Sequence, residues 1–400
     1  MDHRLRKSYN ENFTIEKYEA FKKYVGDAFG HVPKFRLCET PVFMDADMRK
    51  KLLDACEEIN EVLIRPDFKS RTDAAILNSP LNVPNEDDRS RFIQMDFGIC
   101  INSSGELLPQ LIEIQGFPSL YFFQDLLYHG YREIFDIPKD HTSHFQGLDS
   151  ASYIEVMRRI IVGDADPKNV VLLEIEPEKQ ATSIDFYAAE AQLGIKILCL
   201  SKMKKRDRKL YYLDGQGREI PIHRIFNRVI FDELVQRKDL EREFYFADEV
   251  DVEWVGHPNW FFRISKFTMP LLSGKYVPES FYLDQIEEYP VDLENYVLKP
   301  LYSFAGMGVN LHITSDALDK ITDRENYILQ RKVQYAPVIE TPTGPAKFEI
   351  RMLMVWEKDE PRPKVINNLI RVSKGEMVGV RYNKDKDWVG ASVGFFAPEK

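Results

Sequence analysis

A lysine, a serine and two glycines lie close together in the run YVLKPLYSFAGMGV at 296–309, and residues of these types can bind phosphate. Lys299 lies near the end of a predicted strand, and Ser303, Gly306 and Gly308 follow it in a loop. Glycines let backbone N–H groups approach phosphate oxygens closely, and the lysine adds positive charge there. The run lacks the GK[ST] ending of a Walker A loop. It predicts a phosphate-binding loop, with an ordinary surface turn after a strand as the alternative.

Two acidic residues and a glutamine occur on neighbouring predicted strands that are otherwise mostly apolar. Asp96 belongs to RFIQMDFGICI, and Glu113 and Gln115 belong to LLPQLIEIQG. Glu113 and Gln115 are two residues apart, so their side chains point to the same face of one strand. A carboxylate in apolar surroundings needs a counter-charge or a metal, and magnesium prefers oxygen ligands. The pattern favours a magnesium site, with a solvated strand face as the alternative.

Three arginines interrupt apolar strands: Arg228 in RIFNRVIF, Arg351 in FEIRMLMV and Arg371 in NNLIRVS. The planar guanidinium fork matches the oxygens of phosphate and carboxylate groups. One such arginine is usually part of a structural ion pair. Three in one chain, two of them near the glycine loop in sequence, favour an anion-binding cavity. The histidines are scattered and GxSxG is absent, so a catalytic triad has little support.

The composition is typical of a globular protein with more than one core. The chain has 400 residues, of which 44% are hydrophobic and 30% charged, which predicts two or three packed subdomains. The net charge of −10 argues against a general attraction to nucleic acid or to an anionic membrane.

The cysteines and the apolar runs bear on the cellular compartment. Four cysteines are scattered without a CxxC pair, which favours reduced thiols over a zinc or disulfide framework. No apolar run approaches the roughly 20 residues that span a bilayer, and the N-terminus lacks an apolar signal core. We therefore expect a cytoplasmic protein with no nucleic-acid or membrane partner, and the oligomeric state stays open.

The spacing of apolar residues predicts helices first and then alternating strands and helices. We expect a helical region at 1–80, and further helices at 117–135, 184–194 and 262–272. We expect strands at 91–101, 107–116, 170–175, 195–200, 223–229, 295–301, 327–335, 347–356, 364–373 and 376–383. A hairpin with Asp-Gly and Gln-Gly turns is expected before the strand at 223–229. The β-α-β order at 170–200 predicts a small parallel sheet and an α/β fold.

The order of YVLKPLYSFAGMGV, YILQRKVQY, KFEIRMLMVW and VINNLIRVS resembles the ATP-grasp fold of amide-forming ligases. In most of that superfamily a metal-binding E-x-N segment follows these strands. The similar segment here lies early, as Asp96 followed by Glu113-Ile114-Gln115. This order resembles the circularly permuted ATP-grasp group, which includes the synthetase part of glutathionylspermidine synthetase. The resemblance covers roughly residues 90–395 and implies that the early carboxylates lie beside Lys299 in space.

The resemblance implies a circularly permuted ATP-grasp fold, α/β or α+β in class, with four segments. They are a helical N-terminal segment at 1–88, a permuted metal-binding part at 89–163, a Rossmann-like subdomain at 164–256 and an ATP-binding part at 257–400.

The resemblance also implies a role for individual residues. Nucleotide-binding residues would be Lys266, Lys299, Ser303, Gly306, Gly308 and, along the adenine pocket, Gln330, Lys332 and Val333. Asp96, Glu113 and Gln115 would hold Mg²⁺, and Arg351 and Arg371 would stabilise the γ-phosphate or an acyl phosphate. The chain departs from the family pattern in three ways. Gln115 replaces the usual asparagine, and the glycine loop is sparse. The arginine expected just before Asp96 has no clear match, because Gln94 is two residues before it and Arg91 is five before.

The activity implied by the resemblance is that of an ATP-dependent carboxylate–amine ligase using ATP and Mg²⁺. ATP would phosphorylate a small-molecule or peptide carboxylate, and an amine would attack the acyl phosphate to form an amide. Two alternatives are a nucleotide-binding protein that has lost catalysis and an ATP-dependent phosphotransferase. Product analysis separates the ligase from the phosphotransferase, and metal-dependent ATP turnover separates both from a binding protein.

Overall fold

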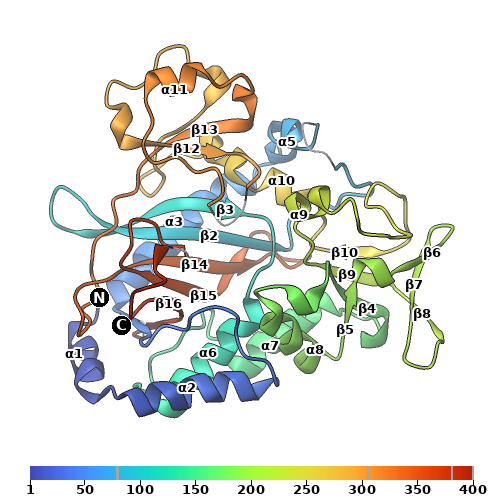
Figure 1. The fold of residues 1–400 in the computed structure, drawn as a ribbon, viewed down its shortest axis with the longest axis horizontal. Coiled ribbons are helices and arrows are strands. Elements are labelled where there is room, and N and C mark those ends of the chain that lie inside the picture. Colours follow the sequence, from blue (N-terminus) through green and yellow to red (C-terminus); the bar gives the residue numbers. More distant parts are fainter. Residues whose placement is uncertain (78–80, 304–305, 380–381, 399–400) are drawn as a thin grey trace.

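The chain has a mixed α/β fold, and the strands of its described residues form five sheets with helices around them (Figure 1). The computed structural model describes residues 1–77, 81–303, 306–379 and 382–398. Among these residues no helix is long and apolar enough to cross a membrane. The four segment boundaries expected from the resemblance stay predictions.

The largest sheet joins strands from the two ends of the chain. Its order is β16-β15-β14-β2-β3, and neighbouring strands are antiparallel. The strands are β2 (Phe92–Ile101), β3 (Leu107–Gln115), β14 (Lys347–Val355), β15 (Lys364–Ser373) and β16 (Gly390–Ser392). The early segment with Asp96 therefore pairs directly with the late segment with Arg351.

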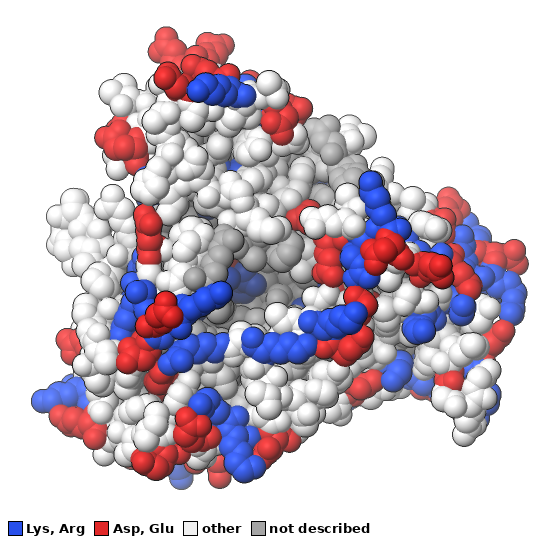
Figure 2. Space-filling model, in the orientation of Figure 1, with Lys and Arg blue, Asp and Glu red and all other residues white. Residues whose placement is uncertain are grey.

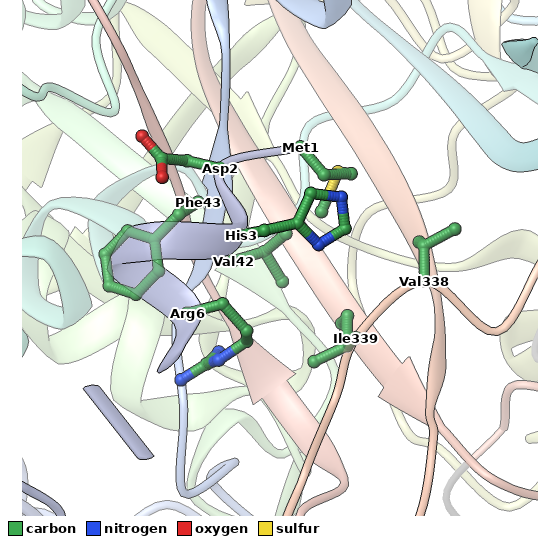
Figure 3. Close-up of a pocket in the computed structure, with 8 residues that line it drawn as sticks. All are labelled: Met1, Asp2, His3, Arg6, Val42, Phe43, Val338 and Ile339. Carbon is green, nitrogen blue, oxygen red and sulfur yellow. The ribbon is translucent and has the colours of Figure 1, made fainter. Parts of the chain in front are cut away.

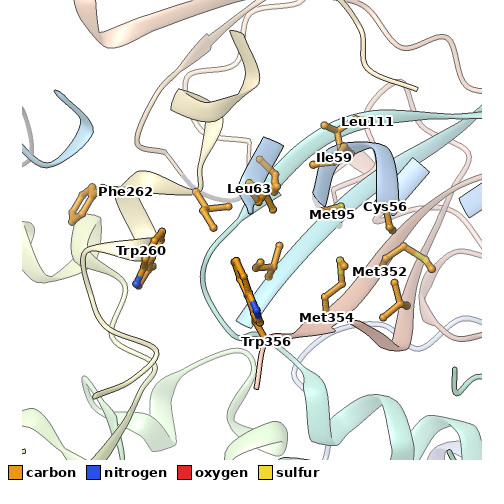
Figure 4. Packing of buried hydrophobic residues seen from close by; sticks show 14 of the residues in the cluster. Cys56, Ile59, Leu63, Met95, Leu111, Trp260, Phe262, Met352, Met354 and Trp356 are labelled. Atoms are coloured by element: carbon orange, nitrogen blue, oxygen red, sulfur yellow. The ribbon is translucent and has the colours of Figure 1, made fainter. Parts of the chain in front are cut away.

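One face of this sheet is covered by the helix α3 (Ala46–Leu63), which belongs to the expected helical region. Asp45 caps the helix by accepting from the Met48 N–H, which pairs one of the free donors at a helix start. Figure 4 shows Cys56 and Ile59 of α3 packed over the sheet. Because side chains alternate along a strand, this contact leaves the opposite sheet face for Asp96 and its neighbours.

The expected small parallel sheet is confirmed, with the order β10-β9-β4-β5. Its strands are β4 (Val170–Glu174), β5 (Lys196–Cys199), β9 (Arg224–Asn227) and β10 (Glu253–Val255). The helix α8 (Ser183–Leu193) connects β4 to β5 and ends at Gly194, whose positive φ suits a helix C-terminus. The expected hairpin is a three-stranded sheet of β6 (Lys204–Arg206), β7 (Lys209–Leu213) and β8 (Glu219–Pro221).

A smaller lobe at the top of Figure 1 is built on the sheet β11-β13-β12. It contains β11 (Ser280–Tyr282), β12 (Tyr296–Pro300), β13 (Tyr327–Arg331) and the helix α11 (Ser315–Asp319). Tyr296, Leu298 and Leu329 face the lobe's own core. The alternate residues Lys299, Ile328 and Gln330 therefore point the other way, and Ile328 belongs to the main core.

The remaining helices and strands support these sheets. The helices are α1 (His3–Asn12), α2 (Ile15–Ala28), α4 (Phe68–Arg71), α5 (Asp73–Leu77), α6 (Tyr121–Ile134), α7 (Ser150–Ile161), α9 (Phe231–Gln236) and α10 (Trp260–Arg263). The 3-10 turns are η1 (Pro167–Asn169), η2 (Pro177–Lys179), η3 (Leu200–Lys202), η4 (Lys266–Leu271), η5 (Leu283–Gln285), η6 (Leu293–Asn295) and η7 (Arg324–Asn326). A two-stranded parallel sheet joins β1 (Val42–Met44) to β17 (Gly394–Phe396).

Three expectations about the elements were wrong. The helix expected at 262–272 is the end of α10 and the 3-10 helix η4, which contains Pro270, and proline lacks the N–H that an α-helix needs. The described residues of the strand expected at 376–383 are bends, apart from Tyr382, which has 3-10 conformation, and 380–381 lie outside them. The expected helical region also contains β1, whose strand partner is over 300 residues away.

Candidate functional site

The site is built on the register of three adjacent strands. Arg351 on β14 lies directly opposite Asp96 on β2, and Asp96 lies opposite Glu113 on β3. Residues directly opposite one another point to the same face of a sheet. A bulge follows Asp96 in the β2–β3 pairing. The register thus puts one arginine and two carboxylates in a row on the face away from α3.

Two arginines hold the carboxylate of Asp96. Arg351 donates from Nε to Oδ1 at 2.6 Å and from Nη2 to Oδ2 at 2.7 Å, and Arg371 Nη2 also donates to Oδ2. Arg351 Nη1 donates to the Gln94 side-chain oxygen at 3.0 Å. Burial would raise the pKa of Asp96, but the two guanidinium groups outweigh it and hold that pKa below its usual value.

A third carboxylate, Glu349, belongs to the same face. Its Oε1 accepts from Arg371 Nη2 at 2.5 Å, and its Oε2 accepts from the Tyr335 hydroxyl at 3.2 Å. Burial raises the pKa of Glu349 although Arg371 opposes the shift. Burial would lower the pKa of Arg371, but the carboxylates of Glu349 and Asp96 raise it overall. Arg371 therefore stays charged while it joins two carboxylates on neighbouring strands.

Two lysines reach the same row from the smaller lobe and from η4. Lys299 Nζ donates to the carbonyl oxygen of Ile112 at 2.9 Å, next to Glu113. Lys266 Nζ lies 3.9 Å from Glu113 Oε2 and donates to the Ser303 carbonyl oxygen at 2.5 Å. Burial lowers the pKa of Lys299 to about 8, and Glu113 partly offsets that shift. The expectation that the early carboxylates lie beside Lys299 is confirmed.

The residues expected at the adenine pocket lie on and after β13. Gln330 is buried, and neither its amide nitrogen nor its amide oxygen has a hydrogen-bond partner. Lys332 is bonded elsewhere, because its Nζ donates to the Glu294 carbonyl oxygen at 2.6 Å. Val333 and Tyr335 lie against Gly98 on β2, where a Cβ would come within 2.9 Å and 2.7 Å of them. Gly98 thus lets this segment approach the large sheet closely.

The glycine loop has a backbone that only glycine adopts easily. Gly306 has φ of 69° and Gly308 has φ of 70°, in the left-handed region that side chains disfavour. A Cβ on Gly308 would also lie 2.7 Å from Pro300 Cγ. Residues 304–305 of this run lie outside the described residues.

The expected magnesium ligands are close together, but their oxygens differ in availability. Glu113 has a side chain that is 22% exposed, whereas that of Asp96 is 1% exposed. Gln115 turns its amide N–H to Glu113 Oε1 at 2.6 Å. Within the described part of the chain, no group of three or more His, Cys, Asp or Glu side chains is arranged to hold a metal ion.

The third arginine of the sequence pattern, Arg228, has a structural contact. It donates to Asp185 Oδ2 at 2.7 Å, and both side chains are buried. Asp185 Oδ1 in turn accepts from the N–H groups of Phe122 and Phe123 at the start of α6. Asp185 thus links α8 both to Arg228 and to the start of α6, so the structural alternative holds for Arg228, while Arg351 and Arg371 do come together.

Sequence reasoning missed Glu349, Gln94 and Tyr335 as members of the site. Glu349 and Gln94 are each two residues before a recognised site residue, and the strand alternation that paired Glu113 with Gln115 could have found both. Tyr335 is two residues after Val333 in the strand expected at 327–335, so the same alternation could have found it, although β13 itself ends at Arg331.

The surface is hollowed between the smaller lobe and the rest of the molecule, with Lys and Arg side chains along the lower rim (Figure 2). Two other pockets lie elsewhere. The pocket of Figure 3 lies between α1, β1 and the segment 338–339, and its volume of about 10 Å³ suits at most one water. A second pocket of about 250 Å³ lies between β10 and the segment before β2, lined among others by Asp87, Arg91 and His257.

Comparisons with known proteins concern the fold. The chain is similar to the structure of a glutathione synthetase-like effector from Globodera pallida, with a TM-score of 0.58 and 11% identity over 96% of each chain. It also matches a putative gamma-glutamylcysteine synthetase from Methylobacillus flagellatus at a TM-score of 0.37 and 12% identity over 82% of each chain, too low to support a shared fold. No protein-family model and no curated protein matches the sequence. The likeness is to a glutathione synthetase-like fold and does not single out glutathionylspermidine synthetase.

Proposed function

We propose that this chain is an ATP-dependent carboxylate–amine ligase with a circularly permuted ATP-grasp fold. The observation that carries the proposal is the convergence of Lys266, Lys299, Arg351 and Arg371 around one row of carboxylates. The row is assembled from both ends of the chain, on a fold like that of a glutathione synthetase-like protein.

The charges of this cluster favour an anionic ligand. Four basic side chains face three acidic ones, Asp96, Glu113 and Glu349, which leaves one net positive charge. The groups are largely buried, so water screens them weakly. Positive charge fixed in this way stabilises phosphate oxygens both in the bound nucleotide and in the transition state of phosphoryl transfer.

In the proposed reaction the chain's own residues position the triphosphate and stabilise the phosphate group that is transferred. Lys299 and Lys266 would bind the triphosphate, and the carbonyl of Ser303 keeps Lys266 directed to the start of the glycine loop. Arg351 and Arg371 would neutralise the γ-phosphate as it passes to the carboxylate of a small-molecule or peptide substrate. The acyl phosphate would then be attacked by an amine, releasing phosphate. Catalysis would come from orientation and charge rather than from a protein nucleophile.

The unpartnered amide of Gln330 supports a nucleotide as the ligand. A buried polar group without a partner costs about 1–3 kcal/mol, and both polar atoms of this amide lack one. An amide offers a donor and an acceptor side by side, which is the pattern that reads the edge of adenine. Gln330 on β13 lies opposite Val297 on β12. Val297 and Lys299 are two residues apart on β12, so Gln330 and Lys299 point to the same face of this sheet, and one ligand could reach both.

Magnesium fits this site through Glu113 and Gln115. Glu113 is partly exposed and next to the lysines, and Gln115 could present its amide oxygen by rotating the amide. When bound with the nucleotide, magnesium would neutralise part of the triphosphate charge. The net positive charge of the empty cluster disfavours metal binding without nucleotide.

A nucleotide-binding protein without catalysis is the second candidate. It is favoured by the Gln115 amide, which donates to Glu113 rather than facing a metal with its oxygen.

The ligase is tested by trapping its intermediate. The protein is incubated with ATP, Mg²⁺, a panel of amino acids and dipeptides, and hydroxylamine, which converts an acyl phosphate into a hydroxamate. The proposal predicts ADP and hydroxamate in equal amounts for at least one carboxylate, and an amide when an amine replaces hydroxylamine. Lys299→Met should abolish both products, while Lys320→Met, an exposed lysine of the same lobe, should not. ATP binding without any product would favour the second candidate.

A further inference from the structure

The carboxylate of Asp96 is almost fully enclosed, and it accepts three hydrogen bonds from two arginines. Its side chain is 1% exposed, Oδ1 accepts from Arg351, and Oδ2 accepts from Arg351 and Arg371. Charge-assisted, bidentate bonds of this kind are the strongest that side chains form. An incoming cation would have to break them and leave Arg351 with no carboxylate contact but the longer one to Glu113, at 3.7 Å, which is costly in a buried setting.

The same contacts determine where the two arginines lie. All three guanidinium nitrogens of Arg351 donate, Nε and Nη2 to Asp96 and Nη1 to Gln94. Arg371 is fixed through Nη2 by Asp96 and Glu349, and its side chain remains 36% exposed. Asp96 is the only described residue that bonds to both guanidinium groups, so it sets their separation.

We propose that Asp96 is a positioning residue, which holds Arg351 and Arg371 side by side as a two-arginine clamp for a phosphate group and does not contact the metal. The metal contact is left to Glu113 and Gln115. This inference rests on the proposed nucleotide site and assigns Asp96 a role different from the one its resemblance to the ATP-grasp pattern implies.

Three roles for Asp96 predict three different effects of Asp96→Asn on ATP affinity. If Asp96 were only a negative charge near the phosphates, its removal would strengthen binding. If it were a metal ligand, its removal would weaken binding in Mg²⁺ and leave binding in EDTA unchanged. If it positions the arginines, binding weakens by the same factor in both conditions, because the clamp loosens whether or not metal is present.

The experiment measures ATP affinity by calorimetry in Mg²⁺ and in EDTA for the parent, Asp96→Asn and Glu113→Gln. We expect Asp96→Asn to lose roughly tenfold or more in both conditions, the scale of a lost charged hydrogen bond. We expect Glu113→Gln to lose only the gain that Mg²⁺ gives the parent. A loss in Asp96→Asn confined to the Mg²⁺ condition, or a gain of affinity, overturns the inference.

A double-mutant cycle guards against a variant that simply folds poorly. If Asp96 acts through Arg351, then Asp96→Asn should cost little more once Arg351→Met is present, so the two losses should not add. Additive losses would contradict positioning. Glu349→Gln, which frees Arg371 from its other carboxylate, should also weaken ATP equally in Mg²⁺ and EDTA. A failure of the parent to bind ATP in either condition would instead refute the proposed function.

Discussion

The buried amine of Lys299 gives ATP binding a pH dependence that can be calculated from the structure. Burial lowers the pKa of Lys299 to about 8, against the opposing effect of Glu113. A lysine with a lowered pKa is charged below that value and becomes neutral as the pH rises through it. A triphosphate binds the charged form better, so ATP affinity should fall between pH 7 and pH 9.

The size of the effect follows from the charged fraction. With the pKa at about 8, roughly nine-tenths of the lysine is charged at pH 7 and roughly one-tenth at pH 9. If only the charged form binds, ATP affinity falls about tenfold over this range, or about 1.4 kcal/mol. Because the bound phosphates raise the pKa, binding at pH 8 should take up about half a proton.

Calorimetry of ATP binding at pH 7, 8 and 9, in two buffers of different ionisation enthalpy, measures both quantities. Lys299→Met should bind ATP weakly and lose the pH dependence, whereas Lys320→Met should behave as the parent. If affinity stays constant from pH 7 to pH 9 and no proton is taken up at pH 8, Lys299 does not contact the triphosphate and the reasoning is refuted.

Three further substitutions separate function from stability. Gln330→Met should raise the melting temperature, because it removes an unpartnered buried amide worth about 1 kcal/mol or more, and should weaken ATP binding; lower stability would contradict the assigned role. Gly308→Ala should destabilise the chain by about 1–2 kcal/mol in urea unfolding and weaken ATP binding, because of its positive φ and the contact with Pro300; an unchanged unfolding midpoint would count against it. Burial would raise the pKa of Asp125, but the bond to His144 lowers it overall. The parent should therefore be more stable than Asp125→Asn at pH 7, and this difference in stability should be lost as the pH falls below about 4. Equal unfolding midpoints at pH 7 would contradict this.

The sequence predicted what depends on local pattern. The strands that contain Asp96, Glu113 and Arg351 consist mostly of apolar residues, with polar residues at alternate positions in places, and this pattern predicts strands. The small parallel sheet follows from its β-α-β order. The sequence could not predict the register that puts Arg351 opposite Asp96, because the two residues are 255 positions apart. Any slip of that pairing by one residue would have turned Arg351 to the α3 face.

Two other features depend on contacts that no local pattern reports. The strand β1 exists because it pairs with β17 at the far end of the chain, so its three residues carry too little signal alone. Tyr335 joins the site because Gly98 leaves room for it on β2. In both cases the deciding interaction is between segments more than 200 residues apart.

The most direct test of the account is a crystal structure of the protein with a non-hydrolysable ATP analogue and Mg²⁺. The account predicts the triphosphate between Lys299 of the smaller lobe and Arg351 and Arg371 of the large sheet, with the base at Gln330. A nucleotide bound elsewhere would contradict it. So would crystals soaked at a saturating concentration of the analogue in which no nucleotide lies between these residues.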